Sequence, residues 1–420
     1  MIQTIELMPG ITLRCFPDSR FKQSCLSIQL LRPLCREEAA MNALIPAVLL
    51  RGTRTAPDLR AITLRLDDLY GASVGALVRR VGDVQTTGFY CNFIAERYTL
   101  GQEALLEPMV DFVGQLLFQP VLEKGVFRKD YVQSEKKNLI STLQTQLNDK
   151  RAYAGNRLFE IMCKDDPFGV PRLGRVADAK NITPKKLFEH YRKILSESPV
   201  HLFYVGSEDP QRVADLLRPL FAGIDRALSA PLQQTPFRPC AGEEITETMQ
   251  VTQGKLALGY YTPITTRSED FAAMQVCNMV LGGGMTSKLF MNIREKQSLC
   301  YDISSGYYGS KGILTVSAGI DWEKEAFVRE QIEAQLDACR QQNITQDELD
   351  AAKSALCSSL AGTHDSPGAI EGYYASGALS GFPLTPDQYA RRVREVTAAD
   401  CARVAQSLQQ HTSFFLKGDA

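Results

Sequence analysis

The sequence has little of what a nucleic-acid binder or a membrane protein needs. Lys and Arg number 47 against 48 Asp and Glu, which leaves a net charge of −1 and no basic excess for binding nucleic acid. No uninterrupted apolar run approaches the roughly 18 residues of a membrane-spanning helix. The first residues also lack the basic stretch and apolar run of a signal peptide. We therefore expect a cytoplasmic protein that binds neither nucleic acid nor membranes.

Side chains that bind metals are also scarce. The chain has only four histidines, and no two of them are spaced as i, i+3 or i, i+4: His190, His201, His364 and His411. The eleven cysteines are odd in number, are spread along the chain and form no C-x-x-C motif. We expect reduced, mostly buried thiols, with no metal and no cofactor.

The composition is otherwise that of a globular protein. Hydrophobic residues make up 44% and charged residues 23% of 420 residues, a length that suggests more than one domain. Residues 226–243 contain three prolines and no sustained periodicity, as is typical of a linker. The sequence thus predicts an N-terminal domain of residues 1–225 and a C-terminal domain of residues 244–420.

The two halves share one pattern. LSIQLLRP precedes REEAAMNALIPAVLLRG in the first half, and LALGYYTP precedes SEDFAAMQVCNMVLGGG in the second. Each is an apolar strand, a polar connector and an apolar helix, and adjacent strand pairs and long helical segments follow in both halves. The pattern predicts an α+β protein made of two similar halves, each a mostly antiparallel sheet with helices packed on one face.

Three segments in succession resemble the M16 peptidases, the group of pitrilysin, insulinase and the mitochondrial processing peptidase. NMVLGGGMTSKLFMNIREKQSLCYDISSGYYG, residues 278–309, is similar to the C-terminal half of that family. DPFGVPRLG at 166–174 and the helix-then-strand pattern from Ile182 are similar to parts of its first half. The resemblance implies the duplicated fold of that family, which agrees with the internal repeat.

The resemblance also implies where a zinc site would lie. The family motif H-x-x-E-H places two histidines and a glutamate on one helical face before an RGT-like turn. With LLRGT at residues 49–53 as the register, these positions hold Ala43, Pro46 and Ala47. In the later helix, Glu135 matches an auxiliary glutamate, and Thr142 replaces the third ligand. The resemblance therefore implies a chain without the metal site and without peptidase activity of its own.

Other family positions are retained. Arg294 and Tyr301 match an arginine and a tyrosine that assist the substrate in the C-terminal half of the family. A forked guanidinium suits a carbonyl or carboxylate, and a phenol can donate to a developing oxyanion. Gly282, Gly283 and Gly284 match a glycine-rich segment used in peptide recognition, although a tight connection between helices explains them equally well. We predict substrate binding by these five residues.

The combination resembles the non-catalytic member of paired bacterial M16 proteins. It implies a heterodimer in which a zinc-bearing sibling cleaves the peptide and this chain contributes Arg294 and Tyr301. The peptide would bind in extended form along a sheet edge. A scaffold subunit without peptide binding is the alternative, and an independent peptidase with displaced chemistry has little support in the sequence.

Overall fold

The computed structural model describes residues 2–101, 103–228 and 232–418. Two compact units make up the chain. The first consists of Met1–Gln144, Val170–Gln233 and His364–Ser376, and the second of Thr145–Gly169, Gln234–Thr363 and Gly377–Ala420. This division differs from one at the 226–243 linker, because residues 145–169 belong to the second unit and residues 364–376 to the first. The predicted linker has neither helix nor strand in its described residues, and the two predicted domains stay a prediction.

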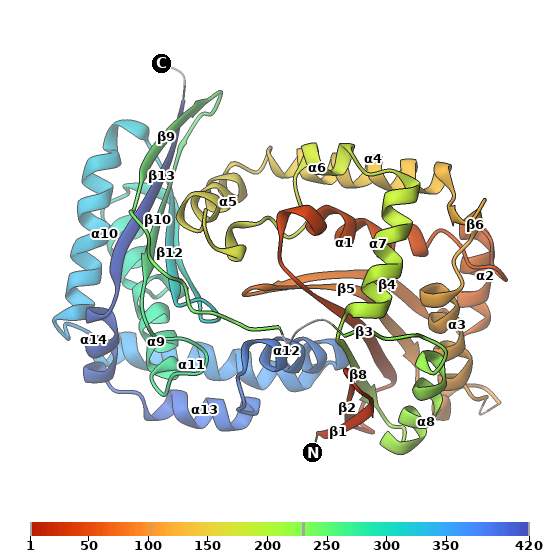
Figure 1. The fold of residues 1–420 in the computed structure, drawn as a ribbon. Coiled ribbons are helices and arrows are strands. Elements are labelled where there is room, and N and C mark those ends of the chain that lie inside the picture. The colour runs from red at the N-terminus through yellow and green to blue at the C-terminus, as the bar shows by residue number, and fades with distance from the viewer. Residues whose placement is uncertain (1, 102, 229–231, 419–420) are drawn as a thin grey trace. The chain divides into compact units, whose positions relative to one another are not determined.

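The first unit contains a six-stranded sheet in the order β1-β2-β8-β3-β5-β4 (Figure 1). All neighbours are antiparallel except β2 and β8, which are parallel. The strands are β1 (Gln3–Met8), β2 (Ile11–Pro17), β3 (Gln23–Pro33), β4 (Ser73–Val81), β5 (Val84–Ile94) and β8 (Val200–Gly206). A separate two-stranded ribbon consists of β6 (Leu122–Glu123) and β7 (Val126–Phe127).

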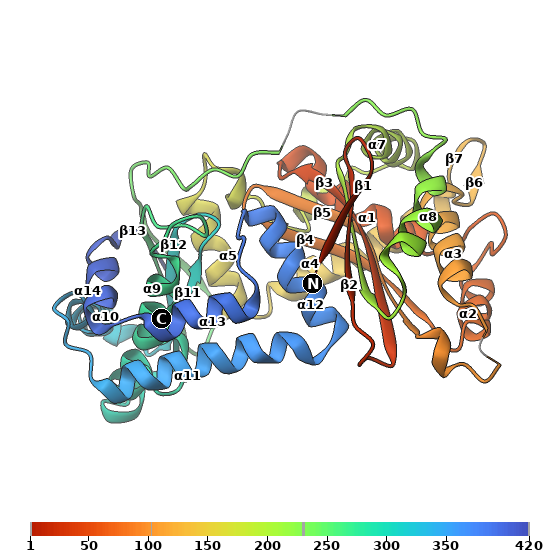
Figure 2. The same cartoon turned by 90° about the horizontal axis from the view of Figure 1, so that it is seen from below.

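Helices cover one face of this sheet because alternate strand residues on that face are apolar. Leu26, Ile28 and Leu30 of β3 are buried in the same cluster as Leu44 and Val48 of α1. Figure 2 shows α3 beside α8 at one end of the unit. The helices are α1 (Arg36–Leu49), α2 (Leu59–Asp68), α3 (Leu106–Phe118), α4 (Lys129–Gln146), α6 (Val176–Lys180), α7 (Pro184–Glu197) and α8 (Pro210–Phe221).

The sheet of the second unit repeats the topology of the first. Its order is β9-β13-β10-β12-β11, again with one parallel pair, β9 and β13. In chain order these strands correspond to β2, β3, β4, β5 and β8, so β1 is the addition in the first unit. The strands are β9 (Glu244–Met249), β10 (Gly254–Tyr261), β11 (Cys300–Tyr308), β12 (Ile313–Ile320) and β13 (Gln409–Gly418). The predicted α+β duplication is confirmed.

In the second unit α9, α10 and α14 lie on one side of the sheet, and α5 packs on β10 and β13 from the other side (Figure 1). The bounds are α5 (Lys150–Met162), α9 (Phe271–Asn278), α10 (Glu325–Arg340), α11 (Gln346–Gly362), α13 (Pro386–Glu395) and α14 (Ala398–Gln406). α12 (Pro367–Ser380) begins at Pro367, where the sequence predicted a break in the long C-terminal helix.

A buried carboxylate holds the segment His364–Ser376 within the first unit. Glu371 is fully buried and accepts hydrogen bonds from Ser27 Oγ at 2.8 Å and Gln29 Nε2 at 2.7 Å. Arg79 of β4 donates to both oxygens of Glu371, at 2.9 and 2.7 Å. Ser27 and Gln29 alternate with the apolar core residues of β3, so the segment lies on the sheet face opposite α1.

We predict that Glu371→Ala lowers the free energy of unfolding by about 3 kcal/mol. The change removes the carboxylate of the Glu371–Arg79 ion pair and leaves the guanidinium of Arg79 partly buried without its counter-charge. The loss of stability lies at the low end of the range for buried ion pairs because the side chain of Arg79 is a third exposed. Glu371→Gln retains an acceptor for Ser27 and Gln29, so its loss should be smaller. Urea unfolding followed by circular dichroism measures both, and a loss below about 0.5 kcal/mol for Glu371→Ala would contradict this account.

Candidate functional site

The three motif positions in α1 present no group that can bind a metal. Ala43 and Pro46 are buried, and Ala47 is half-buried. None of them carries a nitrogen, a carboxylate or a thiol on its side chain. The donor set of a catalytic zinc site, which normally takes three protein ligands, is therefore missing from this helix. Restoring one donor by mutation would supply a single ligand at most.

Helix α1 continues through Pro46 because another residue replaces the missing backbone donor. A proline has no N–H, so it leaves the carbonyl four residues earlier, that of Asn42, without its helical partner. The hydroxyl of Thr87 on β5 donates to that carbonyl oxygen at 2.6 Å. The proline is thus accommodated by a strand residue, and α1 extends to Leu49.

Helix α4 carries the other two family positions. Glu135 forms an ion pair with Arg51 across 3.2 Å, which ties α4 to the turn after α1 as the motif register requires. Thr142 lies seven residues further along, or about two helical turns, and therefore on the same face as Glu135. Its side chain is exposed and offers one hydroxyl where the family has a carboxylate.

The residues present do not fit the zinc of the catalytic family members. Within residues 2–101, 103–228 and 232–418, no three His, Cys, Asp or Glu side chains converge in a way that could hold a metal ion. We therefore derive no step through a metal in this chain.

A network of neutral polar groups lies beneath α1 instead. Asn42 is fully buried, donates Nδ2 to Gln85 Oε1 at 2.8 Å, and places Oδ1 2.7 Å from His190 Nε2. Since Asn42 Oδ1 can only accept, His190 carries its proton on Nε2. Burial lowers the pKa of His190 to about 4, so the ring is neutral near pH 7. Gln85 also donates to the carbonyl oxygens of Ala39 and Arg172, at 3.1 and 2.6 Å.

In the second unit, Arg294 and Tyr301 line one pocket of about 400 Å³. The guanidinium of Arg294 lies over the ring of Phe290, 4.5 Å from its centroid, and its nearest carboxylate, Glu295, is 3.5 Å away. The hydroxyl of Tyr301 donates to Asp321 Oδ1 at 3.3 Å, and its side chain is 57% exposed. Tyr301 is therefore exposed and Arg294 half-buried, and each has few protein partners among the described residues. The assignment of this pair as substrate-binding stays a prediction.

Two π-helical segments lie at and after the glycines, and Gly282 and Gly283 belong to the first of them. Residues Met279–Gly283 and Leu289–Lys296 both form π-helix, a rare conformation that is frequent at functional sites. Gly282 is buried, and a Cβ there would lie 2.7 Å from the backbone nitrogen of Ser305 on β11. Close packing is therefore the observed role of Gly282, whereas Gly283 is exposed. Peptide contact by the three glycines stays a prediction.

Sequence reasoning missed the neighbours that complete this pocket. Asp321 lies at the end of β12 and pairs with Lys324 at 2.9 Å, and the hydrogen bond from that ammonium lowers the pKa of Asp321. Cys300 also lines the pocket, and burial raises the pKa of its thiol to about 11. It therefore stays protonated at neutral pH and is a poor nucleophile. The sequence did indicate that β11 pairs with β12. That pairing, which brings the end of β12 close to the start of β11, was the one signal that could have located Asp321.

Comparisons with known proteins agree with this geometry. Residues 181–356 match the model of the Peptidase M16 inactive domain. A probable inactive metalloprotease of Bacillus subtilis, YmfF, is 30% identical over 409 residues, which is 97% of this chain and 96% of the relative. An uncharacterized zinc protease of Streptomyces coelicolor is 24% identical over 75% of this chain and 70% of its own length.

Solved structures repeat the fold. A conserved protein from Enterococcus faecalis superposes with a TM-score of 0.92 at 29% identity, covering 100% of this chain and 99% of the other. A peptidase M16 inactive domain from Pseudomonas fluorescens gives a TM-score of 0.82 at 18% identity, covering 100% and 98%.

The duplicated fold and the missing donors define a peptidase homologue that has no catalytic site of its own. The chain belongs to the M16 peptidase family, and within that family it is a non-catalytic member. Among the described residues, no helix is both long and apolar enough to cross a bilayer.

We predict that the stability of the protein falls on acidification between pH 6.5 and 4.5 because of its buried histidines. An unfolded histidine titrates near pH 6.5, whereas burial lowers the pKa of His190 to about 4 and that of His201 to about 3. The unfolded state therefore binds more protons in this window, and the free energy of unfolding decreases as the pH falls. Carboxylates such as Glu38, with a pKa of about 2, act below this window.

His190→Gln tests this assignment, because glutamine can donate to Asn42 without titrating. The free energy of unfolding of this variant, measured with urea, should depend on pH less steeply than that of the wild type. The difference in slope corresponds to at most about one proton. Equal slopes for His190→Gln and the wild type would contradict the assignment.

Proposed function

We propose that this chain is the non-catalytic subunit of a heteromeric zinc peptidase and binds extended peptide. The proposal rests on a contrast between the two halves of the chain. The position for a metal in α1 has no donors, while Arg294 and Tyr301 line one solvent-facing pocket. A zinc-bearing sibling chain would supply the metal, and this chain would supply the guanidinium and the phenol.

The chemistry of the pair suits the proposed role. Stacking on Phe290 orients the guanidinium of Arg294, and beside its ion pair with Glu295 it keeps donors that can reach a substrate carbonyl or carboxylate. The phenol of Tyr301 is a neutral donor that can stabilise negative charge as it develops on a carbonyl oxygen. Neither group performs hydrolysis alone, so the zinc of the sibling chain would have to activate the nucleophile while this pair binds the substrate.

The edge of β4 offers a place for an extended peptide. Arg172 Nη1 donates to the Val78 carbonyl at 2.6 Å, from outside the sheet, so Val78 points its backbone groups away from β5. Backbone direction alternates along an antiparallel strand, and Val74 and Ala76 therefore also point outward. A Cβ added at Gly75 would meet open space. These groups can pair with an added strand.

A cytoplasmic location is part of the proposal. All eleven cysteines are free, and most of them are buried. Free thiols in such number are typical of a reducing compartment.

We predict that mixing the chain with a zinc-bearing M16 sibling from the same organism gives peptide cleavage that depends on this pair. Tyr301→Phe and Arg294→Ala should each lower kcat by about 100-fold, as removal of an oxyanion donor does. Tyr308→Phe, on the same strand but packed against Phe159, is the matched control and should leave kcat unchanged. Full activity of the Arg294→Ala/Tyr301→Phe double variant would refute the half-site proposal.

We also predict that Ala76→Pro weakens peptide binding without unfolding the chain. The proline removes an outward N–H that takes no part in pairing with β5, so one hydrogen bond to the peptide is lost, about 3- to 10-fold in Kd. Fluorescence anisotropy with labelled 15-residue peptides of mixed sequence measures the change, and Ala76→Ser is the control. A wild-type chain that binds none of these peptides would favour a scaffold role.

A further inference from the structure

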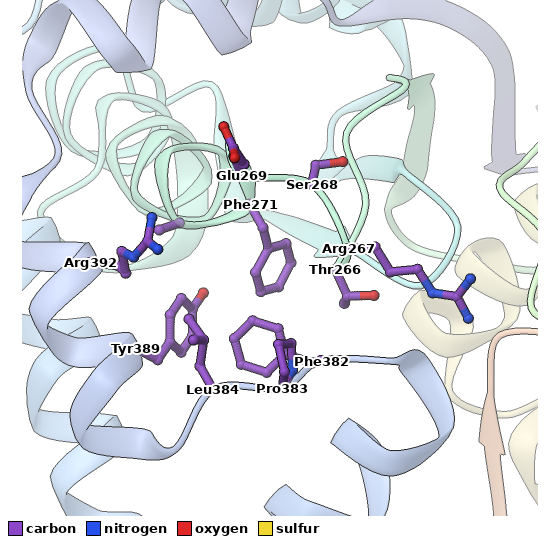
Figure 3. Close-up of a pocket in the computed structure, with 11 residues that line it drawn as sticks. Thr266, Arg267, Ser268, Glu269, Phe271, Phe382, Pro383, Leu384, Tyr389 and Arg392 are labelled. Carbon is purple, nitrogen blue, oxygen red and sulfur yellow. The ribbon is translucent and has the colours of Figure 1, made fainter.

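A second pocket in the C-terminal unit takes no part in the proposed peptidase half-site. Figure 3 shows it between the segment that leads into α9, the loop after α12 and one face of α13. Its volume is about 180 Å³, and it shares no lining residue with the pocket of Arg294 and Tyr301. Two parts of the chain that are distant in the sequence, residues 266–272 and 382–392, therefore build a separate cavity.

The pocket has an aromatic wall that is already in place. The rings of Phe271 and Tyr389 stack with centroids 5.7 Å apart and an interplanar angle of 19°. Phe382 packs edge-on against both, at 5.2 and 4.9 Å (Figure 3). Phe271 and Tyr389 are buried, so a ligand meets rings that are fixed by packing and does not have to order them.

The size of the pocket matches one aromatic side chain. An apolar cavity of about 150 Å³ accommodates benzene, so a volume of about 180 Å³ admits a single ring and little more. A further ring would continue the edge-to-face packing of Phe271 and Phe382.

Two arginines line the pocket on opposite sides of the rings (Figure 3). Arg392 lies on α13, and Arg267 precedes α9 and extends its guanidinium outward, away from the rings. Within the part of the chain that the structure describes, neither guanidinium has a hydrogen bond or an ion pair to a carboxylate. Nearby Arg403, by contrast, is paired with Asp270 and Asp400. One acidic side chain, Glu269, also lines the pocket, which leaves a positive rim around an apolar floor.

We propose that this pocket docks an aromatic side chain carried on an acidic segment of a partner polypeptide. The ring would fill the cavity, and carboxylates on either side of it in the segment would pair with Arg267 and Arg392. The placement of the two cations on opposite sides favours a polypeptide over a small molecule, because acidic residues before and after the ring reach both. The site is independent of the proposed peptidase function.

The test uses the full chain and a labelled peptide, acetyl-Gly-Asp-Glu-Phe-Glu-Asp-Gly-amide, measured by fluorescence anisotropy. We expect saturable binding that weakens with salt, and binding at least about tenfold weaker when alanine replaces the phenylalanine. Arg267→Glu/Arg392→Glu should also weaken binding about tenfold or more. Arg391→Glu/Arg394→Glu, on the same helix and with the same change in charge, should alter Kd less than about threefold, because neither residue lines the pocket.

Four results would overturn the proposal. The wild type does not bind the peptide, or it binds the alanine peptide as tightly as the phenylalanine peptide. The Arg267→Glu/Arg392→Glu variant binds the peptide as tightly as the wild type. Free phenylacetate displaces the labelled peptide as well as the unlabelled peptide does, which would indicate a site for a small aromatic acid. Sedimentation velocity adds one more. A wild-type dimer that Arg267→Glu/Arg392→Glu dissociates, without peptide binding, would make a second copy of the chain the occupant.

Discussion

The packing of α1 against the sheet of the first unit determines what this chain can do chemically. Asn42 uses its side chain and its carbonyl to bind His190, Gln85 and Thr87, all within hydrogen-bond distance. The same helix carries Ala43 and Ala47 where the family motif has its two histidine ligands, and Pro46 where it has its glutamate. A helix that is fixed by neutral buried groups, with a proline in its third turn, is well suited to structure and unsuited to holding a divalent ion.

Because the first unit has no metal ligands in α1, the retained Arg294 and Tyr301 of the second unit need an explanation of their own. Tyr301 is exposed and Arg294 is half-buried, and neither completes a buried network, so stability alone explains them poorly. They are easier to explain as groups that meet a ligand. The π-helical turns beside them bring Gly282 against β11, and this conformation is frequent at functional sites.

Much of the fold could be predicted because local patterns repeat. The strand-connector-helix pattern around the two AAM sequences predicted the duplication, and the strand order of both sheets agrees with it. The transfer of His364–Ser376 to the first unit was not predictable, since it depends on Glu371 meeting Ser27 more than 340 positions away. A lone glutamate in an apolar helix gives no sign of its partner.

The candidate site was likewise predictable only in part. Register alone located Ala43, Pro46 and Thr142, because RGT and Glu135 fixed the alignment, and the Arg51–Glu135 ion pair supports that register. Sequence did not indicate Asp321, which meets Tyr301 through the pairing of two strands. It also did not indicate the π-helices, which place Arg294 over Phe290 within one helical segment. The pocket around Phe271 was also missed, because its rings come from segments about 110 residues apart in the sequence.

The most direct test of the central claim is the zinc content of each subunit, measured by mass spectrometry on the separately purified chains and on their complex. The account predicts less than a tenth of an equivalent of zinc on this chain alone, and one equivalent per complex, held by the sibling. One equivalent on the isolated chain, together with peptide cleavage that a chelator abolishes, would contradict it.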